Sequence, residues 1–105
     1  MLDDAPATRY RWVLYGVAER IARITLNRPE ARNAQSTELL RELDHAILAA
    51  GEDPEVRVVV IAGAGDHFSA GHDIGTPEEA AWREAHPMEP GIRGFHDRTW
   101  RLYVD

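Results

Sequence analysis

The run Ser69-Ala70-Gly71-His72-Asp73 places small residues and a glycine shortly after a predicted strand. Small side chains let the atoms of a ligand approach the main chain closely. Backbone N–H groups in such a loop can stabilise negative charge on a reacting oxygen without help from a charged side chain. Taken alone, the loop is equally typical of an ordinary strand-to-helix connection, so both interpretations stay open at this point.

The same stretch of chain invites two other interpretations. Gly63 and Gly65 follow a strand as in a dinucleotide-binding turn, but Phe68 occupies the place of the third glycine, where a helix must pack closely. His67 and His72 lie beside aspartates, yet nothing nearby completes a set of metal ligands. We therefore expect neither a metal nor a separate cofactor at this loop.

The elements that must position the loop begin with a predicted hairpin. Alternation of residue types predicts strands at residues 10–14 and 21–26, with a turn within residues 16–20. The side chains expected to share one face are Tyr10, Trp12 and Leu14 in the first strand and Ala22, Ile24 and Leu26 in the second.

A βαβ unit is predicted to follow the hairpin. Ser36 or Thr37 is expected to cap a helix that ends at Gly51. Its apolar stripe at helical spacing is Leu39, Leu40, Leu43, Ala46, Ile47 and Ala50. The β-branched run of residues 56–62 predicts a strand buried on both faces. Residues 63–66 then leave this strand at its carboxyl end, where open α/β sheets place their ligands.

Further helices are predicted towards the end of the chain. Thr76 as cap and Pro77 at the first helical position predict a helix over residues 76–86, and the acidic pair Glu78-Glu79 is explained by that helix start. A loop is expected over residues 86–94.

The last predicted helix, residues 95–105, stops without a cap or a breaker. We therefore expect residues 1–9 to be a flexible lead-in and residues 10–105 to be the amino-terminal part of a longer, apparently truncated domain.

Composition excludes several classes of protein. The chain has 105 residues, enough for one small domain, and a net charge of −6 from interspersed acidic and basic residues. Nucleic-acid binding needs a concentrated basic stripe, so we expect no nucleic-acid partner. There are no cysteines, and no apolar run approaches the roughly 18 residues of a membrane span. We expect a cytoplasmic protein with no membrane partner.

Two motifs carry a resemblance to a known family. Residues 25–34 read TLNRPEARNA, and residues 58–74 read VVVIAGAGDHFSAGHDI. In this order, with an amphipathic helix between them, they closely resemble the crotonase (enoyl-CoA hydratase/isomerase) family, from about Tyr10 to Asp73. The resemblance implies an α/β fold, here a partial crotonase-like ββα spiral of hairpin, βαβ unit and following helices.

The resemblance also implies a ligand and a chemistry. Crotonase enzymes act on coenzyme A thioesters through an enolate, whose oxygen gains negative charge that pre-aimed donors must stabilise. The backbone N–H of His72 matches the family's first oxyanion donor. Ala70 and Gly71 would border the bent adenine portion of coenzyme A. Asp73 and Ile74 would hold the start of the next helix and line the path of the acyl group.

Other residues are implied to contact the coenzyme. The full set of expected acyl-CoA contacts is Arg28, Arg32, Asn33, Ala34, Ser69, Ala70, Gly71, His72, Asp73 and Ile74. Arginine suits phosphate because of its planar fork of donors. Either arginine could equally be a surface residue that pairs with Glu30 or Glu38. Residues 33–34 are the better candidates for direct backbone contact.

The resemblance leaves the reaction open, because the family's catalytic glutamates lie beyond this part of its fold. We expect the acyl-CoA-binding portion of an enzyme that hydrates 2-enoyl-CoA, inactive as a 105-residue chain, in a parent that forms a trimer or a dimer of trimers. The alternatives are another crotonase reaction, such as double-bond isomerisation, and an inactive module for coenzyme A binding or subunit interaction.

Overall fold

A computed structural model of the chain describes residues 10–87. The lead-in expected at residues 1–9, the helix expected at residues 95–105 and all of residues 88–94 lie outside this described part. The described elements follow the order strand, strand, short 3₁₀ helix, helix, strand, helix.

The first two strands form a hairpin. Strand β1 (Val13–Ala18) pairs antiparallel with β2 (Ile21–Leu26), and β2 begins and ends where the sequence predicts. The turn between them is the pair Glu19 and Arg20, whose φ angles are 53° and 68°. Two consecutive left-handed residues give a hairpin turn whose twist matches that of its strands, although neither residue is the glycine or asparagine that such a turn prefers.

The predicted first strand is wrong in its position and in its inward face. β1 begins at Val13 and extends to Ala18, later in the chain than expected, and the turn at Glu19 and Arg20 lies within residues 16–20, as the sequence predicts. Tyr10 and Trp12, expected to face inward, precede β1 and are partly buried against the core. Within β1, however, Val13 and Tyr15 are the buried residues, and Leu14, expected to share the inward face, is 42% exposed. Alternation shows that two faces differ but does not show which one is inward. The two-residue turn fixes the register, and a slip of one residue moves every side chain to the opposite face.

Helix α2 (Thr37–Glu52) supplies the other half of the core. Ser36 caps it, since its hydroxyl accepts a hydrogen bond from the N–H of Leu39 at 3.1 Å. The expected end at Gly51 is wrong, because the helix continues to Glu52. Asp53 ends it in an extended conformation, as expected for a residue that precedes a proline.

The core lies between α2 and the hairpin. All but one residue of the expected apolar stripe are buried, and Ile47 is partly buried. The buried cluster consists of Val13, Tyr15, Ala22, Ile24 and Leu26 from the sheet and Leu39, Leu40, Leu43, Ala46 and Ala50 from the helix. Removal of this apolar surface from water is the main force that holds helix and sheet together.

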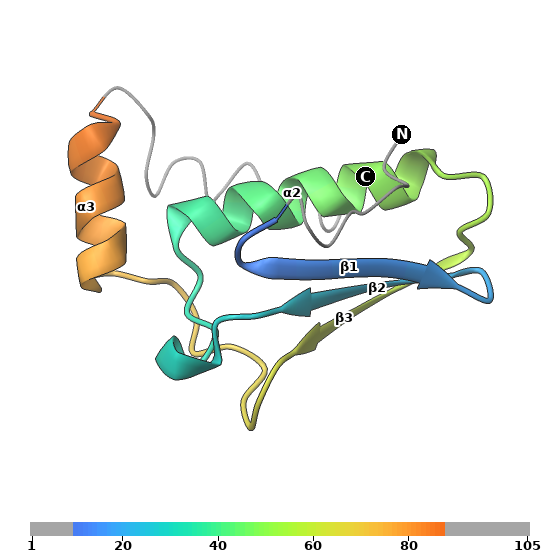
Figure 1. Cartoon of the computed structure of the whole chain (residues 1–105), viewed down its shortest axis with the longest axis horizontal. Coiled ribbons are helices and arrows are strands. Elements are labelled where there is room, and N and C mark those ends of the chain that lie inside the picture. The colour runs from blue at the N-terminus through green and yellow to red at the C-terminus, as the bar shows by residue number, and fades with distance from the viewer. Residues whose placement is uncertain (1–9, 88–105) are drawn as a thin grey trace.

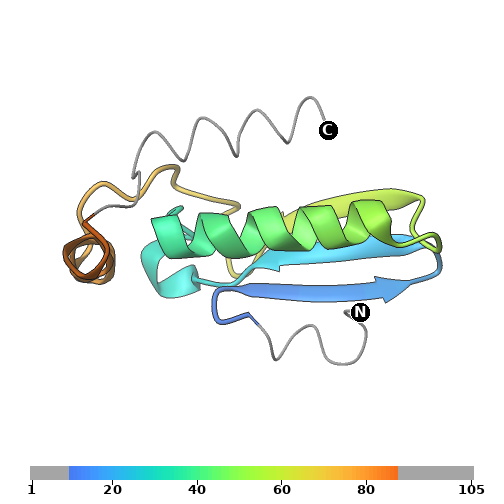
Figure 2. The same cartoon turned by 90° about the horizontal axis from the view of Figure 1, so that it is seen from above.

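Strand β3 (Val58–Gly63) completes a βαβ unit, as the sequence predicts. It lies parallel to β2, so the strand order is β1-β2-β3, and α2 crosses one face of the sheet (Figures 1 and 2). The expected burial on both faces is not found within residues 10–87. Val58, Val59 and Val60 are 40–51% exposed, because β3 is an edge strand here and α2 lies mainly over the other two strands.

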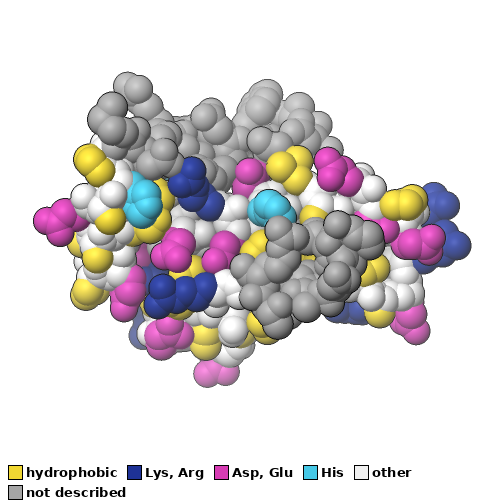
Figure 3. Space-filling view, turned by 45° about the horizontal axis from the view of Figure 1, so that its top comes forward, with side chains coloured by type: hydrophobic (Ala, Val, Ile, Leu, Met, Phe, Trp, Pro, Cys, Tyr) yellow, Lys and Arg dark blue, Asp and Glu magenta, His cyan; other side chains and the backbone are white. Residues whose placement is uncertain are grey.

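Helix α3 (Pro77–Ala85) stands beyond the amino-terminal end of α2 (Figure 1). Thr76 caps it and Pro77 occupies its first turn, as the sequence predicts. On the face in Figure 3, acidic and basic side chains lie interspersed. Neither described helix has the length and apolar character to cross a bilayer.

Candidate functional site

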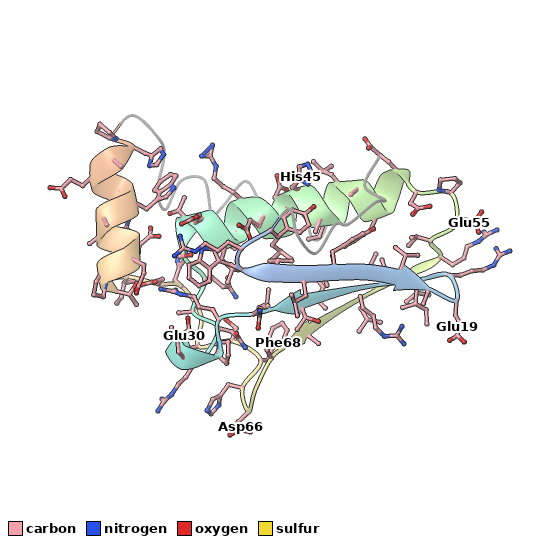
Figure 4. All side chains as sticks on the ribbon, in the orientation of Figure 1. Glu19, Glu30, His45, Glu55, Asp66 and Phe68 are labelled. Atoms are coloured by element: carbon pink, nitrogen blue, oxygen red, sulfur yellow. The ribbon has the colours of Figure 1, made fainter. Side chains whose placement is uncertain are left out.

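Two loops meet at one end of the sheet, where β2 and β3 finish. Figure 4 shows Glu30, from the loop after β2, at the same end as Asp66 and Phe68, from the loop after β3. The loops join through a parallel bridge between Gln35 and His72. This arrangement brings the two sequence motifs together at the carboxyl end of the parallel strands, where the sequence predicts that residues 63–66 leave the sheet.

The bridge fixes the orientation of the amide at His72. The N–H of Gln35 donates to the carbonyl oxygen of Gly71 at 2.7 Å, and the N–H of Asp73 donates to the carbonyl oxygen of Gln35 at 3.0 Å. The Gly71 carbonyl and the His72 N–H belong to one planar trans peptide, in which they point in opposite directions. The N–H of His72 therefore points away from Gln35.

Asn33 joins the two loops through its side chain. Its amide donates to the carbonyl oxygens of Ala64 at 2.9 Å and His67 at 2.8 Å, and its oxygen accepts from the N–H of Arg28 at 2.8 Å. Asn33 is fully buried, and its φ of 56° lies in the left-handed region that asparagine tolerates better than most residues. The side chain shapes the loop from within.

The glycine after β3 is required by a close backbone contact. A β-carbon on Gly63 would lie 2.4 Å from the carbonyl oxygen of Phe68, because the turn folds back against the end of the strand. Gly65 has a φ of 79°, which disfavours a side chain. The dinucleotide-like glycines thus have a structural explanation within this turn.

The hydroxyl of Ser69 holds the other end of the joined loops. It donates to the carbonyl oxygen of Asn33 at 2.8 Å. It accepts from the side-chain amide of Gln35 and from the N–H of Gly71, both at 3.0 Å. Since Gly71 has a φ of 98°, the chain changes direction here, immediately before the His72 amide.

Arg28 lies inside the loops and not on their surface. Its guanidinium is 2% exposed and pairs with Asp73 at 2.7 Å, while also contacting the carbonyl of Ala34 at 3.0 Å and Thr76 at 2.9 Å. A second ion pair, at 3.3 Å, joins it to Glu78. The structure therefore buries this guanidinium against carboxylates and does not expose it for the expected contact with a phosphate. Its acidic partners are Asp73 and Glu78, and not the expected Glu30 or Glu38.

The Asp73 carboxylate is saturated with donors. Besides Arg28, it accepts from the N–H groups of Gly75 at 3.1 Å and Thr76 at 2.9 Å and from the Thr76 hydroxyl at 2.6 Å. Burial alone would raise its pKa, but the hydrogen bonds from Thr76, Arg28 and Gly75 stabilise the charged form and lower that pKa to about 2. Asp73 is thus ionised at neutral pH.

Nine of the ten predicted site residues fall into two sets. Five are at least partly accessible and could meet a ligand, and these are Arg32, Ala70, Gly71, His72 and Ile74. Four are buried and organise the loops, and these are Arg28, Asn33, Ala34 and Asp73. Ser69 lies between, half-buried, with its hydroxyl engaged. The sequence motifs located the site but did not distinguish these two kinds of residue.

Glu79 has a role that the sequence did not indicate. Its buried carboxylate accepts from the N–H and the hydroxyl of Thr37, at 2.8 and 2.6 Å, and from Arg83 at 2.8 Å. Glu79 therefore accepts a hydrogen bond from a backbone N–H in the first turn of α2, which has no partner within that helix, and also lies in the first turn of its own helix. The prediction that the helix start alone explains the acidic pair is wrong, because Glu78 also pairs with Arg28.

Comparison with known families agrees with this arrangement. A sequence model of the enoyl-CoA hydratase/isomerase family matches residues 16–93, which include both loops. The chain belongs to this family. The family assignment and the partial crotonase-like α/β fold, both predicted from the motifs, are confirmed.

Members of the enoyl-CoA hydratase/isomerase family with known sequences or structures match only in part of their length. Mycobacterium tuberculosis EchA13, named as an enoyl-CoA hydratase, is 48% identical over 97 residues, which cover 82% of this chain and 30% of the relative. The chain spans about a third of the length of the curated relatives it matches.

Solved structures of the family share the fold of this chain over part of their length. The enoyl-CoA hydratase/isomerase from Xanthobacter autotrophicus Py2 is 44% identical with a TM-score of 0.61, and the match covers 74% of this chain and 27% of that one. The enoyl-CoA hydratase from Mycobacterium tuberculosis H37Rv is 37% identical with a TM-score of 0.60, and covers 68% and 31% respectively.

Proposed function

We propose that this chain is the acyl-CoA-binding portion of an enoyl-CoA hydratase, and that the N–H of His72 donates a hydrogen bond to the thioester oxygen. The parent reaction would add water to a 2-enoyl-CoA through an enolate, which this donor would stabilise. Loss of one such donor typically costs about 10²–10³ in rate.

One observation carries the proposal. The carbonyl of Gly71 is held by Gln35, so the N–H of the same peptide, that of His72, is directed to the opposite side of the loop. The accessible residues Ala70 and Ile74 flank this amide in sequence, and Ile74 is 80% exposed. A ligand approaching this side would find a fixed donor beside small and apolar groups, as an acyl thioester requires.

Calorimetric titration with two matched ligands tests the donor. Butyryl-CoA carries the thioester carbonyl, and S-butyl-CoA is the thioether that lacks only that oxygen. We define the carbonyl preference as the Kd of S-butyl-CoA divided by the Kd of butyryl-CoA. One hydrogen bond contributes about 1 kcal/mol, so we expect a preference of about fivefold.

Variants at one position separate the amide from the side chain. His72→Pro removes the N–H and should reduce the carbonyl preference to about one, whereas His72→Ala keeps the N–H and should retain the preference. If proline disturbs the loop, replacing the amide at position 72 by an ester through chemical synthesis removes the same donor. Equal binding of both ligands by the unaltered chain, or binding of NAD in place of either ligand, would refute the proposal.

A further inference from the structure

The His72 amide is held from both sides in the sequence, and the two anchors differ in kind. On one side, Ser69 ties Gly71 to the loop after β2 through neutral hydrogen bonds. On the other side, Asp73 is tied to the same loop by a buried ion pair with Arg28. The second anchor is the stronger type, because charge-assisted bonds are roughly twice as strong as neutral ones.

Arg28 spans the bridge between the two loops. One nitrogen of its guanidinium, Nη1, donates both to the carbonyl oxygen of Ala34 at 3.0 Å and to the carboxylate of Asp73 at 2.7 Å. Ala34 directly precedes Gln35, and Asp73 directly follows His72. A single buried nitrogen therefore joins the two loops at Ala34 and Asp73, which are the immediate neighbours of the bridge residues Gln35 and His72.

The ion pair also holds the start of α3. Asp73 accepts from the N–H and the hydroxyl of Thr76, the cap of that helix, and Arg28 donates to the same hydroxyl at 2.9 Å. The chain between His72 and α3 is thus attached to the loop after β2 at several atoms. Rotation of the peptide that precedes His72 would have to break contacts at Gln35 and strain those at Asp73.

We propose that Arg28 and Asp73 are positioning residues that hold the His72 N–H in the orientation required for a thioester oxygen. This inference rests on the proposed binding of the thioester at His72, and it assigns to two buried residues a function that acts through their neighbour. Neither side chain touches the ligand. A lysine could not replace Arg28 fully, since a single ammonium group does not reproduce the planar fork.

The chain offers a matched control for the pair. Glu78 also contacts Arg28, at 3.3 Å, but its side chain is 58% exposed, and within residues 10–87 it bonds to this arginine alone. Asp73→Asn and Glu78→Gln each neutralise one carboxylate partner of the same arginine. The first should alter the loop around His72, and the second should leave it unchanged.

Two readouts test the inference. In titrations, Asp73→Asn should lower the carbonyl preference from about fivefold to near one while leaving the Kd of S-butyl-CoA within about twofold, and Glu78→Gln should keep both values. A general loss of fold would weaken both ligands alike. In ¹H–¹⁵N spectra without ligand, the His72 amide resonance should shift and broaden in Asp73→Asn and stay in place in Glu78→Gln.

The two readouts distinguish the possible failures. If the unaltered chain shows no carbonyl preference but Asp73→Asn still displaces the His72 amide, the proposed function fails and the positioning role stands. If the preference and the amide resonance both survive Asp73→Asn, the positioning role is refuted. Should Asp73→Asn not fold, Arg28→Lys provides the same test with an expected preference of about twofold, and an undiminished preference there would refute the inference.

Discussion

Asn33 offers the sharpest test of how the two loops are held together. Asn33→Asp keeps the shape of the side chain, its tolerance of the left-handed region and the oxygen that accepts from the N–H of Arg28. It removes the two N–H donors that serve the carbonyls of Ala64 and His67 at 2.9 and 2.8 Å. The substitution therefore isolates the contribution of those two hydrogen bonds.

The size of the effect follows from these contacts. Both hydrogen bonds are part-buried, so each carbonyl left without its donor should cost about 1 kcal/mol, at the lower end of the range for a buried group. The two together should cost about 2 kcal/mol at neutral pH, where the new carboxylate also faces two carbonyl oxygens. A protonated carboxyl can donate to one of the carbonyls. Burial beside these oxygens raises the pKa of the introduced group, so the loss of stability should be smaller at pH 5 than at pH 8.

Urea unfolding followed by tryptophan fluorescence measures this loss at each pH. Asn27→Asp is the matched control, since it makes the same change in the same loop, and the side chain of Asn27 has no hydrogen bond within residues 10–87. It should change the free energy of unfolding by less than about 0.5 kcal/mol. A similarly small change in Asn33→Asp would show that the amide does not hold the loops together.

Three further predictions concern other parts of the molecule. The low pKa of Asp73, about 2 against an ordinary 3.8, corresponds to about 2 kcal/mol of folding stability. This contribution is complete above pH 5 and is lost as the pH falls from about 4 to 2, so the urea midpoint of Asp73→Asn should lack this part of the pH dependence. Replacing the turn residues by Glu19→Asn and Arg20→Gly should stabilise the hairpin by about 1 kcal/mol, and an unchanged thermal midpoint would contradict the turn geometry. Val60→Glu, opposite Arg23 in the register, should reduce self-association through the exposed edge strand in sedimentation velocity, and unchanged association would exclude that edge.

Elements governed by local patterns could be predicted from the sequence. The bounds of β2 and the caps of α2 and α3 depend on alternation and on the hydroxyls of Ser36 and Thr76, which act within a few residues of themselves. The end of β1 could not be predicted more closely than residues 16–20, because it depends on a turn of two residues that seldom adopt the left-handed region.

The roles within the site depend on contacts distant in sequence. Arg28 and Asp73 are 45 residues apart, and Thr37 and Glu79 are 42 apart, so no local pattern indicates that they pair. In a loop sequence, an arginine that binds phosphate cannot be distinguished from an arginine that is buried against a carboxylate. The motif located the site, and only the arrangement of the two loops separates accessible residues from buried ones.

The central claim concerns one hydrogen bond, from the N–H of His72 to a thioester oxygen, and the amide proton itself reports on it. In the ¹⁵N-labelled chain, titration with butyryl-CoA should move the His72 amide proton downfield, and titration with S-butyl-CoA should leave it near its free position. The same response to both ligands, or to neither at saturation, would contradict the claim.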